Sequence, residues 1–268
     1  MDNRPIGVFD SGLGGLTAVR RLQELLPHED IIYFGDTGRV PYGTRSEETI
    51  RRYATEDCRL LLDHDVKFII AACGTVSSVA PDVLRSLPIP AIGVVESTAE
   101  AAVNTTKNKR IGIIGTSATV RSRSFEKVMQ ALDPTLSITA EACPMFVSLV
   151  ESGWIDPTDE VAIAMVRRYM IPFKSAGIDT LILGCTHFPL LAPIIQAELG
   201  EDVTLIDSGR ETALRCAGVL NKQNALSAKK DGRCRFFVSD RPEGFTRTAE
   251  IFLGRSVNEE VKSISPQA

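Results

Sequence analysis

Two segments of this chain share one pattern, and this pattern constrains the fold more than any other feature. In residues 181–186 an apolar run stops at a glycine and is followed at once by Cys185 and a threonine. Residues 68–75 have nearly the same arrangement, in which Cys73 ends the apolar run and a threonine follows two positions later. A short apolar run bounded by such a turn is typical of a fully buried strand. The sequence therefore predicts two buried strands that each end in a cysteine.

The wider chain repeats as well. Residues 6–11 are echoed by residues 111–116, and in each half short apolar runs alternate with stretches of helical periodicity. Such alternation indicates an α/β fold, and the repeat predicts two similar α/β domains with mainly parallel sheets, related by pseudo-twofold symmetry. Ligands of open α/β sheets bind beyond the carboxyl ends of the strands. We therefore expect both cysteines at an active site in the cleft between the domains.

The chain also indicates where the two domains meet. A strand predicted at residues 91–95 is followed by a helix and by a polar loop at 104–110, after which the pattern restarts. From Ser208 onward the chain no longer follows the second half, and a helix near 211–220 and a strand at 234–238 are expected to pack back on the first domain. The predicted division is a discontinuous first domain of residues 1–97 plus 209–268, and a second domain of residues 98–208.

Composition excludes several classes of protein. The net charge of −4 gives no global basic field for nucleic acid or an anionic membrane. No apolar run reaches the roughly 20 residues of a membrane helix, and the first residues lack the layout of a signal peptide. Six cysteines without a CxxC pair suggest neither a disulfide framework nor a zinc ribbon. These features predict a cytoplasmic protein with no nucleic-acid or membrane partner.

The other four cysteines are explained more simply by packing. Cys58 and Cys216 fall on apolar helix faces, and Cys234 alternates with apolar residues of a strand. Free cysteine behaves as a small hydrophobe in such positions. Cys143 precedes a proline in a predicted loop, and we expect a structural role for it.

A glycine-rich turn follows the first strand and its terminal Asp10. Glycines at positions 12, 14 and 15 match neither GxGxxG nor a phosphate loop. The turn is compatible with positive φ angles and close helix packing. It is equally compatible with a nest of backbone N–H groups that holds a carboxylate.

Three chemistries could use Cys73 and Cys185, besides the simple possibility that both are small residues at tight turns. Together with His187 they could form a Cys₂His metal site, although the spacing matches no standard metal motif. One cysteine could act as a nucleophile with His187 as base, which leaves the other cysteine idle. The two thiols could instead act as acid and base on opposite faces of one carbon. Each precedes a predicted helix, whose N-terminal N–H groups are expected to lower the thiol pKa.

The motifs resemble those of the cofactor-independent aspartate/glutamate racemase superfamily. No single match is specific, but together they run in family order from the first strand to about Asp207. They are Gly-Val-Phe-Asp-Ser-Gly-Leu-Gly-Gly at 7–15, Gly-Asp-Thr at 35–37, Val-Pro-Tyr-Gly at 40–43, Ala-Cys with Thr75 at 72–75, residues 93–96, Gly-Thr with Thr119 at 115–119, residues 143–151, and Gly-Cys-Thr-His at 184–187.

This resemblance implies interconversion of L- and D-glutamate for peptidoglycan, with neither metal nor cofactor, in proteins that are commonly homodimers. It implies catalytic roles for Cys73 and Cys185, assisted by Asp10, His187 and Glu151. It places the following residues around the substrate: Asp10, Ser11, Pro41, Tyr42, Gly43, Gly74, Thr75, Thr116, Thr119 and Thr186. Hydroxyl and backbone N–H groups suit the two carboxylates of glutamate, and a carboxylate such as Asp10 suits its ammonium group.

Two positions depart from the family pattern. The family usually has Asn where this chain has Gly74, and Pro where it has Ser97. A glycine cannot replace the substrate contact of an asparagine side chain, so substrate preference or rate could differ. The alternatives to interconversion of glutamate are a related racemase activity, such as one on aspartate, or non-catalytic binding of a dicarboxylate.

Overall fold

Two parallel sheets make up the framework of the chain. The computed structural model describes residues 1–242, 245–257 and 261–266. Within this part, six strands form the first sheet in the order β10-β9-β2-β1-β3-β4, and four form the second in the order β6-β5-β7-β8. The strands of the first sheet are β1 (Ile6–Asp10), β2 (Ile31–Gly35), β3 (Phe68–Ala71), β4 (Ala91–Gly93), β9 (Cys234–Val238) and β10 (Val261–Ser263). Those of the second are β5 (Arg110–Gly115), β6 (Ser137–Ala142), β7 (Thr180–Leu183) and β8 (Thr204–Asp207).

The order of the strands confirms the predicted repeat. The series β2-β1-β3-β4 of the first sheet corresponds to β6-β5-β7-β8 of the second, and every pairing in both sheets is parallel. Strands β3 and β7, which precede the two cysteines, therefore occupy equivalent places. The predicted α/β fold class with two parallel sheets is confirmed.

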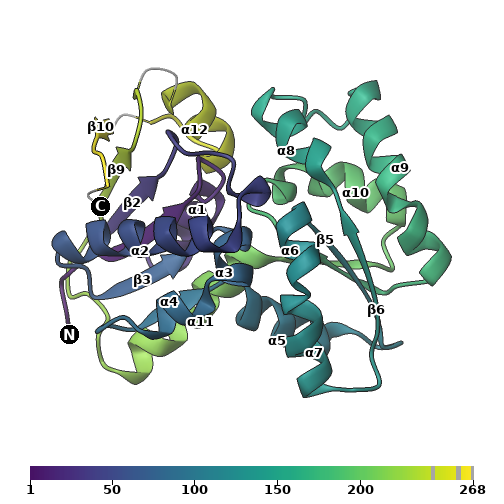
Figure 1. The fold of residues 1–268 in the computed structure, drawn as a ribbon, viewed down its shortest axis with the longest axis horizontal. Coiled ribbons are helices and arrows are strands. Elements are labelled where there is room, and N and C mark those ends of the chain that lie inside the picture. Colours follow the sequence, from purple (N-terminus) through teal and green to yellow (C-terminus); the bar gives the residue numbers. More distant parts are fainter. Residues whose placement is uncertain (243–244, 258–260, 267–268) are drawn as a thin grey trace.

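Helices flank both sheets (Figure 1). The α-helices are α1 (Leu16–Leu25), α2 (Glu47–Asp63), α3 (Gly74–Val79), α4 (Pro81–Arg85), α5 (Val95–Thr105), α6 (Ser117–Ser122), α7 (Ser124–Leu132), α8 (Pro144–Glu151), α9 (Glu160–Ala176), α10 (Ala192–Leu199), α11 (Ser208–Lys222) and α12 (Phe245–Leu253). Two short 3₁₀ helices are η1 (Tyr42–Thr44) and η2 (Phe188–Leu191). Among the helices of the described residues, none combines the length and apolar character that crossing a membrane requires.

Two helices connect the sheets. Helix α5 leads from β4 to β5, and α11 leads back from β8 to β9, which pairs with β2. Figure 1 shows the C-terminal elements beside the N-terminal strands, at the left of the view. The connecting helices pack on each other, and Arg215 of α11 forms an ion pair of 3.1 Å with Glu100 of α5. The domain bounds at residues 97 and 208 stay a prediction, and residues 243–244, 258–260 and 267–268 of that first domain lie outside the described ones.

The strands that carry the site are buried on both faces. All residues of β1, β3 and β7 are buried, which agrees with their continuous apolar runs. The fourth strand is shorter than predicted, since it ends at Gly93 and α5 already begins at Val95. The reason is local, because the backbone N–H of Val94 donates to the Ser77 hydroxyl at 3.0 Å. That bond replaces the strand pairing that the apolar sequence suggested.

Candidate active site

Both cysteines predicted at strand ends line one cleft. Cys73 follows β3 of the first sheet and Cys185 follows β7 of the second, and both side chains are buried. The cleft encloses about 300 Å³, which is the lower end of the range for small-ligand sites. Its lining consists of Asp10, Ser11, Gly12, Val40, Pro41, Tyr42, Gly43, Thr44, Cys73, Gly74, Thr75, Thr116, Ser117, Pro144, Val147, Ser148, Glu151, Cys185, Thr186 and His187. Among the described residues that line the cleft, several carry hydroxyl groups and none is Lys or Arg.

Cys73 is held as a neutral thiol. Its Sγ donates to the Ser11 hydroxyl at 3.5 Å. Burial, followed by the nearby negative charge of Asp10, raises the pKa of Cys73 to about 12. The expectation that a helix N-terminus lowers this pKa is therefore wrong, because desolvation and a like charge outweigh the N–H groups at the start of α3.

Cys185 has a different partner. Its Sγ lies 3.8 Å from Nδ1 of His187, and Nε2 of that ring lies 3.1 Å from Oε1 of Glu151 at the end of α8. Burial alone lowers the pKa of His187, but the contacts with Cys185 and Glu151 prevail and raise it to about 10. A protonated imidazole at this distance stabilises negative charge on the Cys185 sulfur. The two thiols thus sit in unlike electrostatic environments.

Asp10 lies at the end of β1, almost fully buried between the two halves of the site. Its Oδ2 accepts from the N–H of Gly12 at 3.1 Å, and N–H groups of Ser11 and Gly15 also face it. Burial nevertheless raises the pKa of this carboxyl, against the lowering effects of His187 and the N–H groups. The glycine-rich turn is thus a nest whose anion is the chain's own Asp10.

The turn does not depend on positive φ. Gly12, Gly14 and Gly15 are absent from the positive-φ residues of the described chain, so this part of the expectation is wrong. Close approach is what requires glycine. A Cβ on Gly15 would lie 2.6 Å from Cβ of Asp10, and one on Gly14 would lie 2.2 Å from Oγ1 of Thr186.

The predicted threonines form a chain of hydroxyls along the cleft. Oγ1 of Thr75 lies 3.1 Å from Oγ1 of Thr116, which lies 3.0 Å from Oγ1 of Thr119. Thr75, Thr116 and Thr186 line the cleft, whereas Thr119 is buried behind Thr116. Thr119 therefore supports the orientation of Thr116 from within α6.

The loop of Pro41, Tyr42 and Gly43 closes one side of the cleft. The Tyr42 side chain is buried, and its hydroxyl contacts two carboxyl groups, those of Asp36 and Asp57, in place of the cleft. The sequence patterns did not indicate the polar lining residues Thr44, Ser117 and Ser148. Ser148 could have been found, since it precedes Glu151 by three positions and thus shares its face of α8.

Gly74 lies where the two cysteine-bearing loops meet. A Cβ at this position would lie 2.5 Å from the carbonyl oxygen of Gly184, the residue before Cys185. The missing side chain thus permits a close approach of the two loops.

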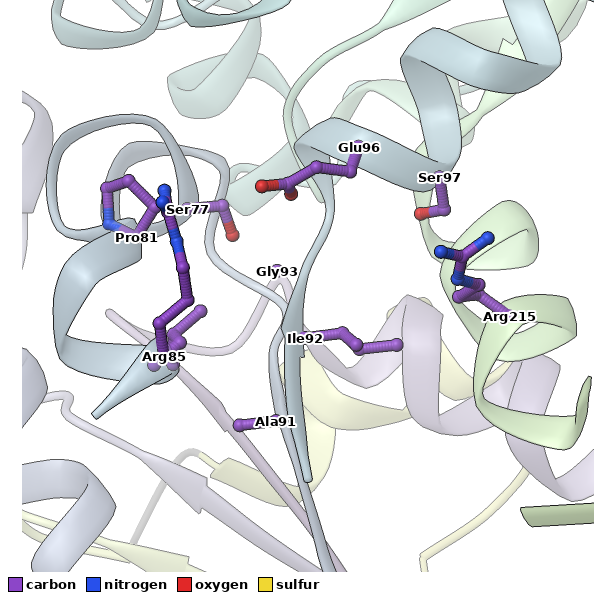
Figure 2. Close-up of a pocket in the computed structure, with 10 residues that line it drawn as sticks. Ser77, Pro81, Arg85, Ala91, Ile92, Gly93, Glu96, Ser97 and Arg215 are labelled. Atoms are coloured by element: carbon purple, nitrogen blue, oxygen red, sulfur yellow. The ribbon is translucent and has the colours of Figure 1, made fainter. Parts of the chain in front are cut away.

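Ser97, the other departure from the family pattern, lies outside the cleft. It lines a separate hollow of about 190 Å³ at the start of α5, which also contains Glu96, Arg85 and Arg215 (Figure 2). Its hydroxyl lies 3.3 Å from that of Thr212. This substitution therefore affects the packing of α5 on α11.

The remaining cysteines are buried, as expected for packing residues. Cys58, Cys143, Cys216 and Cys234 lie within the hydrophobic cores. Across the described ranges, no group of three or more His, Cys, Asp or Glu side chains is arranged to hold a metal ion. The alternative of a Cys₂His metal site thus gains no support from the geometry.

The His187 environment leads to a first prediction. Replacing His187 by Asn should lower kcat by about 100-fold, because the charge beside the Cys185 sulfur is lost. Replacing Glu151 by Gln should cost only a few-fold, because the Glu151 side chain is 48% exposed and water screens its charge. Both effects can be measured by following the optical rotation of glutamate, the substrate that the family resemblance implies. An equal loss in the two variants would mean that the charge on His187 depends on Glu151 despite this exposure.

Comparisons with known proteins agree with this picture. The family model described as Asp/Glu/Hydantoin racemase matches residues 7–216. The chain is 45% identical to the glutamate racemase of Geobacter metallireducens over 253 residues, which cover 94% of this chain and 93% of that protein. It is also 45% identical to the glutamate racemase of Neisseria meningitidis serogroup A over 265 residues, covering 98% and 97%.

Solved structures show the same fold. A glutamate racemase from Bacillus anthracis superposes with a TM-score of 0.94 at 37% identity, over 99% of this chain and 98% of the other. The enzyme from Francisella tularensis, in complex with D-glutamate, superposes with a TM-score of 0.90 at 37% identity, over 98% of both chains.

Fold and site together define a two-sheet α/β protein that presents thiols from equivalent strand ends to one cleft. Among such proteins, the chain belongs to the Asp/Glu/hydantoin racemase family.

Proposed function

We propose that this chain is a glutamate racemase that interconverts L- and D-glutamate by acid–base chemistry of two thiols and supplies D-glutamate for peptidoglycan. The observation that carries the proposal is the shared cleft of Cys73 and Cys185, which follow equivalent strands of two sheets. Inversion at a carbon requires a base on one face and an acid on the other, and a repeated thiol meets this need. Identity of 45% to glutamate racemases over nearly the whole chain supports glutamate as substrate.

In one direction Cys185 acts as the base. Its thiolate, stabilised by protonated His187, removes the Cα proton and becomes a thiol. The electron pair left on Cα is delocalised into the adjacent carboxylate. The neutral thiol of Cys73 then gives its proton to the opposite face of Cα and becomes a thiolate. The reverse reaction exchanges the roles, and the high pKa of Cys73 suits its part as proton donor.

Substrate is held by polar groups, with neither Lys nor Arg among the described residues that line the cleft. Hydroxyls of Ser11, Thr75, Thr116 and Thr186, with backbone N–H groups of the loops, are the available donors to the substrate carboxylates. Asp10 lies beside Cys73 and is the carboxylate available to the substrate ammonium group. Pro41, Gly43 and Gly74 form part of the wall of the cleft.

The deciding experiment is incubation of the purified protein with L-glutamate in D₂O. We expect D-glutamate to form with deuterium at Cα, because the proton returned comes from a thiol that exchanges with solvent. Activity should persist in the presence of a chelator and without added cofactor. Absence of exchange with glutamate would overturn the proposal, and exchange with aspartate alone would redirect it to the related racemase.

The proposal includes a cytoplasmic homodimer, as the family resemblance suggests. Light scattering coupled to size-exclusion chromatography measures the mass of the particle, and a mass of one chain would contradict the dimer.

A further inference from the structure

A cluster of charged groups lies beneath the cleft loop and is not used in the reaction above. Asp36, after β2, and Asp57, in the middle of α2, are each 0% exposed. Arg39 and Tyr42 extend from the loop between them. Buried carboxyl groups are costly unless they are paired or neutralised, so this cluster requires an explanation.

Among the described residues, Arg39 is the only cation that pairs with Asp36 or Asp57. Its Nε donates to Oδ2 of Asp36 at 2.6 Å, and its Nη2 donates to Oδ1 of Asp57 at 2.9 Å. Its Nη1 also pairs with Glu56. Arg52 contacts Glu56 as well, at 3.9 Å. Two positive charges thus face three carboxyl groups, and one uncompensated negative charge would remain if all three were ionised.

The Tyr42 hydroxyl bridges two of these carboxyl groups. It contacts Oδ2 of Asp36 and lies 3.0 Å from Oδ2 of Asp57. A phenol hydroxyl has a single proton, so it can donate to only one of them. The second contact is a hydrogen bond only if the other carboxyl group carries a proton and donates to the phenol oxygen.

The donors around each carboxyl group indicate which one carries the proton. Asp36 accepts from Arg39 and from the Ser239 hydroxyl at 2.6 Å, and Tyr42 is its third donor. Apart from Tyr42, whose single proton serves one carboxyl group, Asp57 accepts only from Arg39 among the donors recorded in the described chain. Asp36 therefore has more hydrogen-bond donors to stabilise a negative charge, and the proton is expected on Asp57. Burial and the adjacent Asp36 also raise the pKa of Asp57 well above its ordinary value.

We propose that Asp57 is a neutral carboxylic acid that donates to the Tyr42 hydroxyl, and that this bond positions the cleft loop at residues 40–44 for substrate. The positioning role of Asp57 in catalysis rests on the proposed racemase function. The protonation of Asp57 does not depend on that function. Asp57 is then a positioning residue, since it acts through Tyr42 and lies outside the cleft.

The loop transmits this bond to the cleft directly. Pro41 and Gly43, on either side of Tyr42, both line the cleft. A Cβ on Gly43 would lie 3.4 Å from Cβ of Thr116, so the loop reaches the second half of the site. The ring of Tyr42 packs on Tyr53 with a centroid distance of 5.1 Å. Loss of the hydroxyl bond therefore frees a wall of the cleft without touching either thiol.

The test compares D57N with D57L. An asparagine amide can donate to Tyr42 and accept from Arg39, so D57N should keep KM within about twofold of the wild-type value. Leucine has a similar size but no hydrogen bonds, and D57L should raise KM by about tenfold with a smaller change in kcat. If D57N raised KM as much as D57L, Asp57 would be an anion and the proposal would be overturned.

A spectroscopic readout is independent of activity. The wild-type infrared spectrum at neutral pH should contain the C=O stretch of a protonated carboxylic acid that is missing from D57N. The matched control is E56Q, which should keep that band because it changes a neighbouring carboxyl partner of Arg39 and leaves Asp57 intact. Failure to find the band in the wild type minus D57N difference would overturn the proposal even if D57L did not fold. If the wild type showed the band but did not racemise glutamate, the proposed function would be contradicted and the protonation of Asp57 would stand.

Discussion

Alanine at position 73 or 185 is expected to reduce racemisation by about 1,000-fold or more. Each thiol transfers a proton to or from one face of Cα, and a positioned acid or base contributes about 10²–10⁴-fold. The Ser11 hydroxyl beside Cys73 is a far weaker acid than a thiol and cannot take over its proton transfer. The loss can be measured from the rate at which optical rotation decays for each enantiomer.

The single variants should differ from each other in a way that simple misfolding cannot imitate. In the Cys73→Ala variant, Cys185 can still remove a proton from one face and return a deuteron to that face. Exchange at Cα should thus persist for one enantiomer without inversion, and the Cys185→Ala variant should retain it for the other enantiomer. The control is Cys143→Ala, which removes a buried thiol of the second half that does not line the cleft. Full turnover in either cleft variant would contradict the two-thiol mechanism.

The elements of the site that could be predicted are those built from local sequence. The cysteines follow apolar runs long enough to specify buried strands, and the repeat of the same pattern placed them at equivalent strand ends. Asp10 and the glycine-rich turn are likewise read from a few adjacent residues. These are features in which local pattern and fold agree.

Contacts between distant segments could not be predicted in this way. No spacing rule links Glu151 to His187, 36 positions later, and only the family resemblance included both. Tyr42 reads as a loop residue that could offer its hydroxyl to a ligand, but Asp36 and Asp57 lie beneath it and take that hydroxyl. The raised pKa of Cys73 depends on burial between two halves of the site. Each of these outcomes is decided by packing that a linear pattern does not contain.

Side chains at position 74 are expected to impair catalysis even though the family resemblance leads one to expect Asn there. The backbone of Gly74 begins α3 without a positive φ, so space alone decides the effect. Any Cβ would lie 2.5 Å from the Gly184 carbonyl oxygen, which is closer than real Cβ atoms approach. Relief requires the loops of Cys73 and Cys185 to move apart. A displacement of about 1 Å between reacting groups costs about 100-fold in rate, and we expect Gly74→Ala to lower kcat by that order with a smaller change in KM.

Gly74→Asn separates two explanations of this glycine. If the cleft works with the loops in contact, the asparagine has the same Cβ clash as alanine, and its kcat should be at least as low. If the loops separate during turnover, the asparagine amide gains access to substrate and kcat should equal or exceed that of the wild type. The matched control is Gly218→Ala in α11, where a Cβ meets nothing within 4 Å and helix propensity should raise stability by about 1 kcal/mol without affecting kcat. Thermal unfolding of the two Gly74 variants and of Gly218→Ala measures the stability of each. A variant that is folded at the assay temperature but has a lower kcat then indicates displaced thiols, not a loss of stability.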